Sequence, residues 1–403
     1  MIGANLSKMS LSDLIDLSVR AQVQGKAYTR KRFCFERLIT CKGKPFVAII
    51  GPRGAGKTTL LKQLLAEKKD TFYLSLDSVD VPDLFDTLKI LCETYHYTTF
   101  LLDEIHHAPA YEQTLKKIYD FLEVHLVFTS SVALSLYESV FDLSRRVTVL
   151  TLYSFSFREY LYFKTGSLLP TLTIQDILEK KWLPEHLRNG HLFESFIRGG
   201  LLPFSMEDPE PLKSCENILN KIIRRDVPLI ANLRIHELEL LSQMTRFVGS
   251  ASVDGISYSS LSHNLKITKY KAAQYVDLLE KAFILQRVMP KGTNVLKEPK
   301  ILLFLPYRLL FKSYEDAVGG LREDYFVEMM AIKGWPVFYL KSTTGKKTPD
   351  YLVKEGSHDY VIEIGGKGKG REQFKGIELT KSIILSHGDD TQGIKRPLFL
   401  AGY

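Results

Sequence analysis

Short apolar runs separated by polar turns recur over residues 46–152 of the sequence. The runs are apolar throughout rather than alternating, which is typical of strands buried on both faces. Stretches with helical spacing separate the first four runs. This alternation favours an α/β fold, in which a parallel sheet is covered by helices on both faces. The predicted strands are Phe46–Ile50, Thr71–Leu76, Thr98–Leu102, Leu126–Ser130 and Val147–Leu152.

A glycine-rich segment follows the first predicted strand and precedes a predicted helix. It reads Gly-Pro-Arg-Gly-Ala-Gly-Lys-Thr-Thr and fits the phosphate-loop pattern known as Walker A at every fixed position. Leucines in the next two turns form one apolar face of the helix. The alternative is a glycine-rich turn that matches by chance, but strand, loop and helix occur in the order the motif needs. The predicted nucleotide-binding residues are Gly51, Pro52, Arg53, Gly54, Ala55, Gly56, Lys57, Thr58 and Thr59.

This pattern of residues suits the chemistry of a bound triphosphate. Glycine lets the backbone adopt turns that a side chain would block. Backbone amides and the start of the helix then point at phosphate oxygens. We expect Lys57 to reach the β- and γ-phosphates of ATP, and Thr58 to place its hydroxyl on Mg²⁺.

Two carboxylates, Asp103 and Glu104, follow the third predicted strand, at the edge of the sheet where ligands bind. They resemble a Walker B element, in which Asp103 would hold Mg²⁺ directly or through water. Glu104 would then be the general base that polarises the attacking water. The alternative is an acidic turn between strand and loop. His106 and His107 come next, and hydrogen bonding within the loop is favoured over metal binding.

The fourth predicted strand also ends in hydroxyl side chains, which include Thr129 and Ser131. Because this strand ends beside the presumed γ-phosphate, one hydroxyl could sense the phosphate or orient the attacking water. Serine and threonine also favour the first position before a helix, so N-capping is an equal alternative.

Composition and charge restrict the class of protein. A chain of 403 residues suggests two to four domains. The net charge of +8 suits an anionic partner such as nucleic acid, or a ligand that is itself an anion. The four cysteines show no metal-binding spacing, and no apolar run approaches the roughly 20 residues of a membrane span. Asp13 and Asp16 lie where a signal peptide would be apolar, so we expect a cytoplasmic protein with no membrane partner.

Taken together, these motifs resemble the prokaryotic AAA-type ATPases that join a P-loop domain to an uncharacterised C-terminal region with a nuclease-like fold. The resemblance implies ATP and Mg²⁺ as ligands, and a homo-oligomer in which Arg146 acts on the γ-phosphate of a neighbouring subunit. The family usually has Gly-Arg at this point, and Arg145 replaces the glycine here. A salt bridge from Arg146 to a strand-end carboxylate is the alternative. The matching segments are 51–59, 101–106, 128–131, 144–146 and 152–160.

Residues 158–235 resemble the helical lid of this family, on the basis of the segments 196–203 and 223–227. The first segment contains the pair Gly199-Gly200, which could act as a hinge. A helix stop is the favoured interpretation of the pair.

Residues 236–295 have the pattern of a winged-helix domain, with three helices and a wing strand at Phe283–Val288. The third helix is predicted at Ile267–Leu279 with Thr268 as its cap. In a DNA reader this helix enters the major groove. The alternative is a module that only packs between domains. The predicted DNA contacts are Lys266, Lys269, Lys271 and Gln274.

Residues 296–403 resemble the PD-(D/E)xK nuclease core, a small α+β domain. Asp350 and Glu363 match the two acidic positions that hold Mg²⁺ on adjacent strands. The lysine of the motif belongs two residues after the glutamate, where this chain has Gly365. Lys367 could reach back from the loop, but an inactive remnant of the nuclease site is favoured.

The sequence therefore predicts an AAA-type ATPase that couples its nucleotide state to movement of the lid and C-terminal domains. Alternatives are a nucleotide-gated scaffold with little turnover and an ATP-dependent DNA-binding or nuclease protein. A lead-in before the first strand carries a basic run at Thr29–Arg32, for which a solvated helix face is favoured over contact with a phosphate or a neighbouring subunit. The predicted divisions are 1–45, 46–157, 158–235, 236–295 and 296–403.

Overall fold

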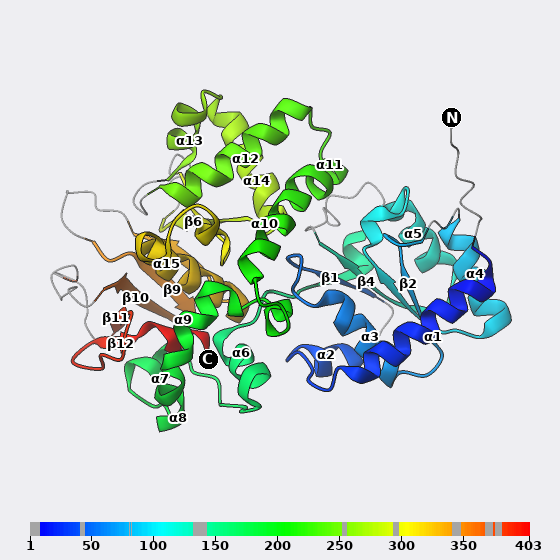
Figure 1. The fold of residues 1–403 in the computed structure, drawn as a ribbon, viewed down its shortest axis with the longest axis horizontal. Coiled ribbons are helices and arrows are strands. Elements are labelled where there is room, and N and C mark those ends of the chain that lie inside the picture. Colours follow the sequence, from blue (N-terminus) through cyan, green and yellow to red (C-terminus); the bar gives the residue numbers. More distant parts are fainter. Residues whose placement is uncertain are drawn as a thin grey trace. The chain divides into compact units, whose positions relative to one another are not determined.

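The computed structural model forms two compact units, Met1–Tyr153 and Ser154–Tyr403, each with its own sheet (Figure 1). The residues that the structure describes are 9–40, 45–79, 81, 83–131, 143–251, 256–292, 298–340, 348–366, 374 and 381–403.

The first unit alternates helices with strands after two N-terminal helices. Its helices are α1 (Leu11–Ala27), α2 (Phe35–Ile39), α3 (Lys57–Glu67), α4 (Leu84–Tyr95) and α5 (Tyr111–Phe121), with short 3₁₀ turns η1 (Ile105–His107) and η2 (Leu143–Arg145). Its strands are β1 (Phe46–Ile50), β2 (Thr71–Ser75), β3 (Thr99–Asp103), β4 (His125–Ser130) and β5 (Val147–Thr151). The five predicted strands are confirmed, each to within two residues at either end.

The strands of the first unit form one parallel sheet in the order β2-β3-β4-β1-β5. Strand β4 lies between β1, which leads into the glycine-rich loop, and β3, which ends in Asp103. Figure 1 shows α1 and α3 along one face of this sheet and α5 over the other. Every residue of β1 is buried, as expected of a central strand covered on both faces. The predicted α/β fold with a P-loop-type parallel sheet is confirmed.

The N-terminal segment packs on this sheet as part of the same unit. Ser10 caps α1 and forms a capping box with Asp13. α1 lies against α3, and the two helices approach so closely that a side-chain carbon on Gly25 would come within 1.9 Å of the carbonyl oxygen of Lys62. Only glycine allows this approach, so α1 is fixed close to the helix that follows the phosphate loop.

The second unit begins with helices and ends with strands. Its helical elements are α6 (Phe157–Thr165), α7 (Ile174–Leu178), α8 (Pro184–Arg188), η3 (Asn189–Leu192), α9 (Phe193–Ser195), η4 (Phe196–Gly200), η5 (Pro203–Met206), α10 (Pro211–Lys221), η6 (Ile222–Asp226), α11 (Val227–Ile230), α12 (Ile235–Ser250), α13 (Tyr258–Leu265), α14 (Lys269–Lys281), η7 (Tyr307–Leu310), α15 (Tyr314–Lys333) and η10 (Leu398–Gly402). Its strands are β6 (Leu285–Pro290), β7 (Lys300–Leu303), β8 (Val337–Tyr339), β9 (Tyr351–Glu355), β10 (His358–Gly365), β11 (Ser382–Ser386) and β12 (Lys395–Pro397).

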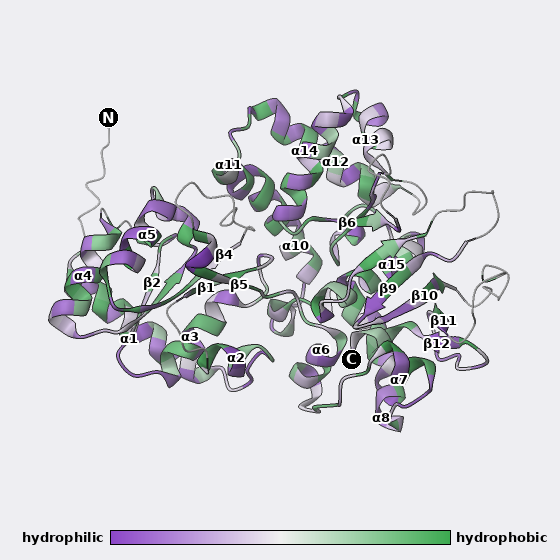
Figure 2. Cartoon of the chain, turned by 180° about the vertical axis from the view of Figure 1, so that it is seen from behind, coloured by the Kyte–Doolittle hydropathy of each residue, from purple (hydrophilic) through white to green (hydrophobic). Residues whose placement is uncertain are grey.

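These strands form a mixed seven-stranded sheet in the order β12-β11-β10-β9-β8-β6-β7. The buried residues of α15 belong to the same hydrophobic core as those of β9 and β10. Figure 2 shows hydrophobic and hydrophilic residues together on α12 and α14, which is typical of helices with one buried face. In the described part of the chain, no helix combines the length and the apolarity that crossing a membrane requires.

The helices expected of a winged-helix region are present, and Thr268 caps α14 by accepting a hydrogen bond from the backbone of Lys271. The expected wing strand is β6, and it joins the large sheet. It pairs with β7 in antiparallel fashion and with β8 in parallel, through Met289 and Pro290. The predicted border at residue 295 therefore falls between two neighbouring strands of one sheet, and the division into five parts stays a prediction.

The glycine pair ends a short helical element. Gly199 has a φ of 128° inside the π-helix η4, a conformation that favours glycine. A side-chain carbon on Gly200 would lie 2.8 Å from the carbonyl oxygen of Ser195. Both glycines are thus required by the local backbone, which agrees with the helix stop that the sequence favoured over a hinge.

Candidate functional site

The glycine-rich loop turns sharply between β1 and α3. Gly54 and Gly56 have φ values of 82° and 88°, which an L-residue with a side chain rarely adopts. Gly56 is also the cap of α3, so the helix begins at Lys57. At the start of the loop, a side-chain carbon on Gly51 would lie 2.1 Å from the carbonyl oxygen of Leu152. The three glycines of the motif are therefore needed for the path of this backbone.

The ammonium group of Lys57 lies against the loop itself. Its Nζ donates hydrogen bonds to the carbonyl oxygens of Gly51 (2.8 Å) and Pro52 (3.0 Å). The residue is only 5% exposed. A positive charge is thus held at the start of α3, where the helix dipole and the loop amides also attract an anion.

The carboxylate of Asp103 receives hydroxyl groups from three different elements. Thr58 at the start of α3 donates to Oδ2 at 2.7 Å, and Tyr73 from β2 donates to the same oxygen at 3.0 Å. Thr129 from β4 donates to Oδ1. Asp103 is 2% exposed, and no lysine or arginine of the described segments pairs with it. Its negative charge is therefore buried among neutral donors.

Thr58 and Asp103 form a donor set that suits Mg²⁺. They lie 45 residues apart in the sequence, and the fold brings their oxygens to 2.7 Å. Mg²⁺ prefers oxygen ligands and is usually held by one or two protein groups together with phosphates and water. The Thr58 hydroxyl and the Asp103 carboxylate, which lie next to the phosphate loop, match this preference. The residues present therefore fit the metal.

Glu104 adopts an unusual backbone conformation directly after β3. Its φ of 52° lies in the left-handed region, which is rare for a residue with a side chain and often found at functional sites. Its backbone amide donates to the hydroxyl of Thr129 at 2.9 Å. Its Oε2 accepts a hydrogen bond from the backbone amide of Ser131 at 3.1 Å. The end of β4 thus orients both the main chain and the carboxylate of Glu104.

His106 supports Glu104 from the loop. Its Nδ1 lies 3.4 Å from Glu104 Oε2 and 3.1 Å from the hydroxyl of Ser130. This is the hydrogen-bonded loop histidine that the sequence favoured over a metal ligand. The helix that Thr129 or Ser131 would cap lies outside the described residues, so only their contacts with Asp103 and Glu104 can be placed.

Arg146 lies at the amino-terminal end of the parallel strands, opposite the end at which the phosphate loop lies. It directly precedes β5, and its carbonyl oxygen accepts a hydrogen bond from the backbone amide of Phe46, the first residue of β1. The phosphate loop follows the opposite end of β1, and a five-residue strand spans about 16 Å. The guanidinium of Arg146 is bound to Asp120 at 3.2 Å. Within one chain, the structure does not bring Arg146 together with Lys57 and Asp103.

Tyr73 and Arg32 also contribute to this site and were not among the predicted site residues. Tyr73 is one residue of an apolar strand, yet its hydroxyl reaches Asp103. Burial raises the pKa of Tyr73 well above its ordinary value, and the charge of Asp103 raises it further. The Tyr73 hydroxyl therefore keeps its proton and remains a donor.

Arg32 belongs to the basic run Thr29–Arg32, for which a solvated helix face was favoured. For Arg32 that prediction is wrong. It is 8% exposed and outside any helix.

The acidic residues of the nuclease-like pattern lie in the second unit. Asp350 directly precedes β9, and its Oδ2 accepts a hydrogen bond from the backbone amide of Ile364 at 2.8 Å. Glu363 lies in β10, the antiparallel neighbour of β9, and is 1% exposed. The register therefore brings the two acidic residues to adjacent strands, as the pattern implied. Lys367 lies outside the described residues, and whether the pair is a vestigial nuclease site stays a prediction.

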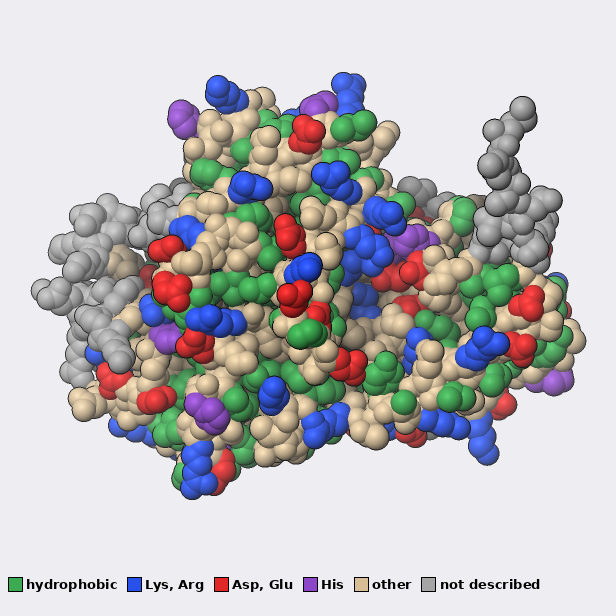
Figure 3. Space-filling model, in the orientation of Figure 1, with side chains coloured by type: hydrophobic (Ala, Val, Ile, Leu, Met, Phe, Trp, Pro, Cys, Tyr) green, Lys and Arg blue, Asp and Glu red, His purple; other side chains and the backbone are tan. Residues whose placement is uncertain are grey.

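Three of the four residues predicted to contact DNA have side-chain partners within the chain. Lys269 pairs with Glu298, and Lys271 pairs with Glu237 at 2.9 Å. Gln274 donates to the hydroxyl of Tyr270 at 3.1 Å, and Lys266 caps the end of α13. Figure 3 shows basic and acidic side chains interspersed over much of the face in view. DNA binding through α14 stays a prediction.

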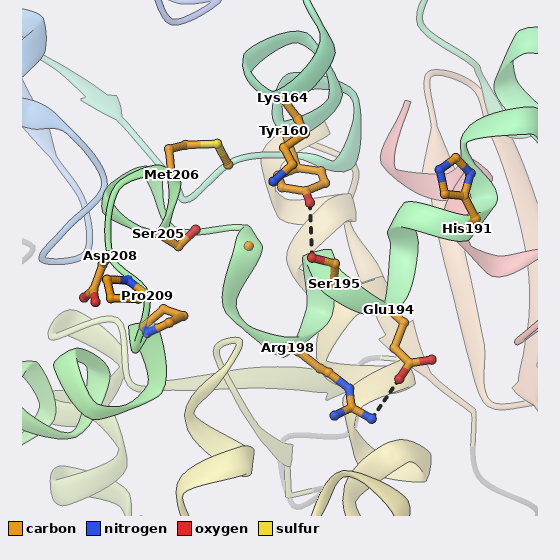
Figure 4. Close-up of a pocket in the computed structure, with 12 residues that line it drawn as sticks. Tyr160, Lys164, His191, Glu194, Ser195, Arg198, Ser205, Met206, Asp208 and Pro209 are labelled. Atoms are coloured by element: carbon orange, nitrogen blue, oxygen red, sulfur yellow. Dashed lines mark hydrogen bonds and ion pairs between the residues drawn. The ribbon is translucent and has the colours of Figure 1, made fainter.

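A cavity of about 630 Å³ lies among the helices of the second unit (Figure 4). Tyr160 donates to the hydroxyl of Ser195 at 3.3 Å on one side of it, and Arg198 pairs with Glu194 at 2.7 Å on another. Its lining carries charges of both signs, so the electrostatics select no class of ligand. The phosphate loop, with Lys57, Thr58 and Asp103, is the better candidate site.

Comparisons with known proteins agree with this geometry in one part of the chain. Residues 43–161 match the model of a family described as an AAA domain. This segment holds the glycine-rich loop, Asp103 and the whole parallel sheet, so the match and the geometry both support an AAA-type P-loop domain here. Residues 191–304 match a domain of unknown function (DUF8612).

Relatives are similar over most of the chain but say little about activity. An uncharacterized protein of Methanocaldococcus jannaschii is 29% identical over 395 residues, which covers 86% of this chain and 81% of that protein. The solved structure of a Walker-type ATPase of Pyrococcus abyssi is 13% identical with a TM-score of 0.39, over 77% of this chain and 99% of that chain.

Two further solved structures match the chain at low identity. The Aeropyrum pernix ORC1 protein in complex with DNA is 13% identical with a TM-score of 0.30, over 80% of this chain and 94% of that one. The Thermotoga maritima RuvB Holliday junction branch migration motor is 15% identical with a TM-score of 0.28, over 68% of this chain and 89% of that one. None of the three superposes on the whole chain well enough to carry a conclusion about it.

Proposed function

We propose that the protein binds ATP with Mg²⁺ and hydrolyses it at the phosphate loop of the first unit. The observation that carries this proposal is the meeting of Thr58 and Asp103 at 2.7 Å beside the loop that holds Lys57. A buried carboxylate, a hydroxyl and a fixed ammonium group are the parts that a metal-bound triphosphate needs.

Each residue has a role that follows from its position. The amides of residues 51–56 and the ammonium of Lys57 bind the phosphate oxygens, while Thr58 and Asp103 hold Mg²⁺. Thr58 and Asp103 would hold the ion, which would supply positive charge next to the phosphates. Thr59 continues the binding segment into the first turn of α3, and Pro52, Arg53 and Ala55 shape the loop.

Glu104 is the general base of the proposed reaction. It accepts the proton of the attacking water, and the amide of Ser131 and the ring of His106 keep its carboxylate oriented. Thr129 links Glu104 to Asp103 through one hydroxyl, which donates to Asp103 and accepts from the Glu104 amide. The two carboxylate residues are thereby connected through one side chain.

Arg146 acts in trans in this proposal. Arg146 and the phosphate loop of the same chain lie at opposite ends of the parallel strands. Arg146 therefore reaches a γ-phosphate only in a neighbouring subunit of a homo-oligomer. The turnover per protomer should then rise with protein concentration, as subunits assemble. Arg146→Ala should remove this rise while leaving ATP binding intact; a turnover independent of concentration in the wild type contradicts the role.

Coupling of the nucleotide state to the second unit is the finer part of the proposal. It predicts that ATP changes hydrogen exchange in residues 158–235, the proposed lid, and not only around the phosphate loop. Identical exchange in the second unit with and without ATP contradicts the coupling. Binding of DNA through α14 is tested separately by adding DNA fragments and measuring the size of the complex.

The experiment that tests the proposal is steady-state ATPase activity of the wild type and Lys57→Ala. The variant should lose at least about 100-fold in turnover, because it lacks the charge that meets the transferred phosphate. Lys89→Ala is the control, since Lys89 is an exposed lysine of another helix, α4. Equal activity of Lys57→Ala and the wild type refutes the proposal, and absence of turnover in a wild type that binds ATP favours the nucleotide-gated scaffold.

A further inference from the structure

The segment between α1 and α2 is tied to the nucleotide site by side chains on both sides. Gln63 of α3 donates through Nε2 to the carbonyl oxygens of Tyr28 and Arg30, each at 2.9 Å. Gln63 is 3% exposed, so these bonds are made in the interior. The segment is therefore held in one position against the helix that follows the phosphate loop.

Arg32 extends from this segment to the phosphate loop itself. Its Nη1 donates to the carbonyl oxygen of Ala55 at 2.5 Å, and its Nη2 donates to the carbonyl oxygen of Tyr153 at 2.9 Å. Ala55 stands between Gly54 and Gly56 in the loop. One buried guanidinium thus joins the middle of the phosphate loop to the chain just after β5.

The contact with Ala55 fixes the direction of a phosphate-binding amide. A trans peptide unit is planar, and its carbonyl oxygen and amide hydrogen point in opposite directions. Because Arg32 holds the Ala55 oxygen, the amide of Gly56 must point away from Arg32, to the other side of the loop. The flanking glycines have little conformational preference of their own, so an external anchor is needed to select this orientation.

The N-terminal helix also reaches the other half of the site. The hydroxyl of Ser18 in α1 accepts a hydrogen bond from the backbone amide of Tyr73 at 3.0 Å, and the hydroxyl of Tyr73 donates to Asp103. The segment before β1 therefore supports both the loop and the carboxylate that would hold the metal.

We propose that Arg32 is a positioning residue for the ATP site, which keeps the phosphate loop in its nucleotide-binding conformation. This inference rests on the proposed ATP binding. In this role Arg32 acts through the backbone of Ala55 and Gly56. Without Arg32, the loop samples other conformations as well. The apparent affinity for ATP then falls in proportion to the population of the binding-competent loop conformation.

The test compares Arg32→Lys and Arg32→Met with the wild type. Lysine has a single ammonium in place of the two-pronged guanidinium and cannot hold both carbonyl oxygens in the same geometry. We expect the KM for ATP to rise about tenfold in Arg32→Met and less in Arg32→Lys, with kcat within about twofold of the wild type. A fall in kcat at unchanged KM, or no change in either, overturns the proposal.

Lys31→Ala is the matched control. Lys31 is the neighbouring residue, carries the same charge, and pairs at the surface with Glu67 at 2.6 Å. Such an exposed pair contributes little, so KM and kcat should stay at wild-type values. An equal rise of KM in Lys31→Ala means that the positive charge of the segment, and not the anchor, is responsible, which contradicts the proposal.

A second measurement does not depend on ATPase activity. Hydrogen exchange of peptides that contain residues 51–58, measured without nucleotide, should be faster in Arg32→Lys than in Lys31→Ala. Unchanged exchange in the loop refutes the anchor even where the activity data agree with it. If the wild type fails to bind ATP, the proposed function fails, but faster exchange in Arg32→Lys would still establish the contact with the loop.

Discussion

Buried carboxyl groups occur in both units of the molecule, but their neighbours differ. Asp103 in the first unit accepts hydrogen bonds from three hydroxyl groups and pairs with no cation of the described segments. Asp324 in the second unit is also inaccessible, yet Arg308 donates to both of its oxygens, at 2.6 and 2.9 Å. A bidentate arginine compensates a buried carboxylate in charge as well as in hydrogen bonds.

Two more carboxyl groups of the second unit are compensated in other ways. Glu323 pairs with Lys300 at 2.6 Å and accepts a hydrogen bond from Tyr351 at 2.9 Å. Within the described residues, Glu328 accepts a hydrogen bond from the backbone amide of Leu305 and from no cation. Burial raises its pKa to about 8, so it is mostly protonated at neutral pH.

The difference separates a structural carboxyl from a functional one. In the second unit, each of these charges is neutralised by a fixed cation or by a proton, so nothing further needs to bind. Neutral hydroxyls can orient the carboxylate of Asp103 but cannot cancel its charge. A buried charge without a partner is unfavourable, and a divalent cation removes that penalty.

The largest effect is expected at the first unit, in Glu104→Gln. The amide keeps the size and accepts the Ser131 hydrogen bond, but it cannot take a proton from water. Turnover should fall by about 100-fold or more with ATP affinity preserved. The measurement is a pair of experiments, single-turnover hydrolysis and equilibrium ATP binding. Loss of binding would assign Glu104 to the binding machinery and would contradict its role as the base.

The next effect concerns Glu328 in the second unit and depends on pH. Its carboxyl is protonated in the folded state up to about pH 8, whereas in the unfolded chain it ionises near 4.5. Between these values the folded state binds one more proton, so the free energy of unfolding should fall by about 1.4 kcal/mol per pH unit as pH rises. Above about pH 8, Glu328 is ionised in both states, and its titration no longer changes the free energy of unfolding.

Glu328→Gln removes this titration while keeping an oxygen for the Leu305 amide. Urea unfolding at several pH values between 5 and 8, in roughly one-unit steps, should show a steeper fall in the wild type than in the variant. Equal slopes would mean that Glu328 is ionised in the folded protein. The second unit would then contain an uncompensated charge of its own, and the contrast with Asp103 would disappear.

A smaller effect is expected for Tyr73→Phe. The variant removes one of the three donors to Asp103 without opening a cavity. Groups that orient a metal ligand typically contribute about 10-fold or more to metal affinity, so the Mg²⁺ concentration for half-maximal ATPase activity should rise about tenfold. Tyr97→Phe is a control in the same unit, because its ring packs on Phe72. A response equal to that of the control would remove Tyr73 from the site.

The strands and the phosphate loop were accessible from the sequence because they depend on local patterns. The buried run Phe46–Ile50 and the glycines after it specify their structure within a few residues. The meeting of Thr58 and Asp103 could also be expected, since parallel strands place their carboxyl ends at one edge.

The remaining contacts join positions with no local relation. Arg32 binds the carbonyl oxygen of Tyr153, 121 residues further along the chain, and a backbone acceptor leaves no trace in the sequence. Tyr73 looks like any aromatic residue of a buried strand. The pairing of β6 with β8 is parallel and joins distant segments, so an isolated wing strand was equally compatible with its apolar pattern.

The central claim is that the buried charge of Asp103, which pairs with no cation among the described residues, holds Mg²⁺ on a nucleotide in the phosphate loop. The most direct test is calorimetric titration of ATP into the wild type and Asp103→Asn, each with Mg²⁺ and with EDTA. Asparagine keeps the shape and removes the charge. We predict that Mg²⁺ strengthens ATP binding to the wild type at least tenfold more than to the variant, because the variant lacks the attraction between the Asp103 carboxylate and the ion. The same gain from Mg²⁺ in both proteins would contradict the account.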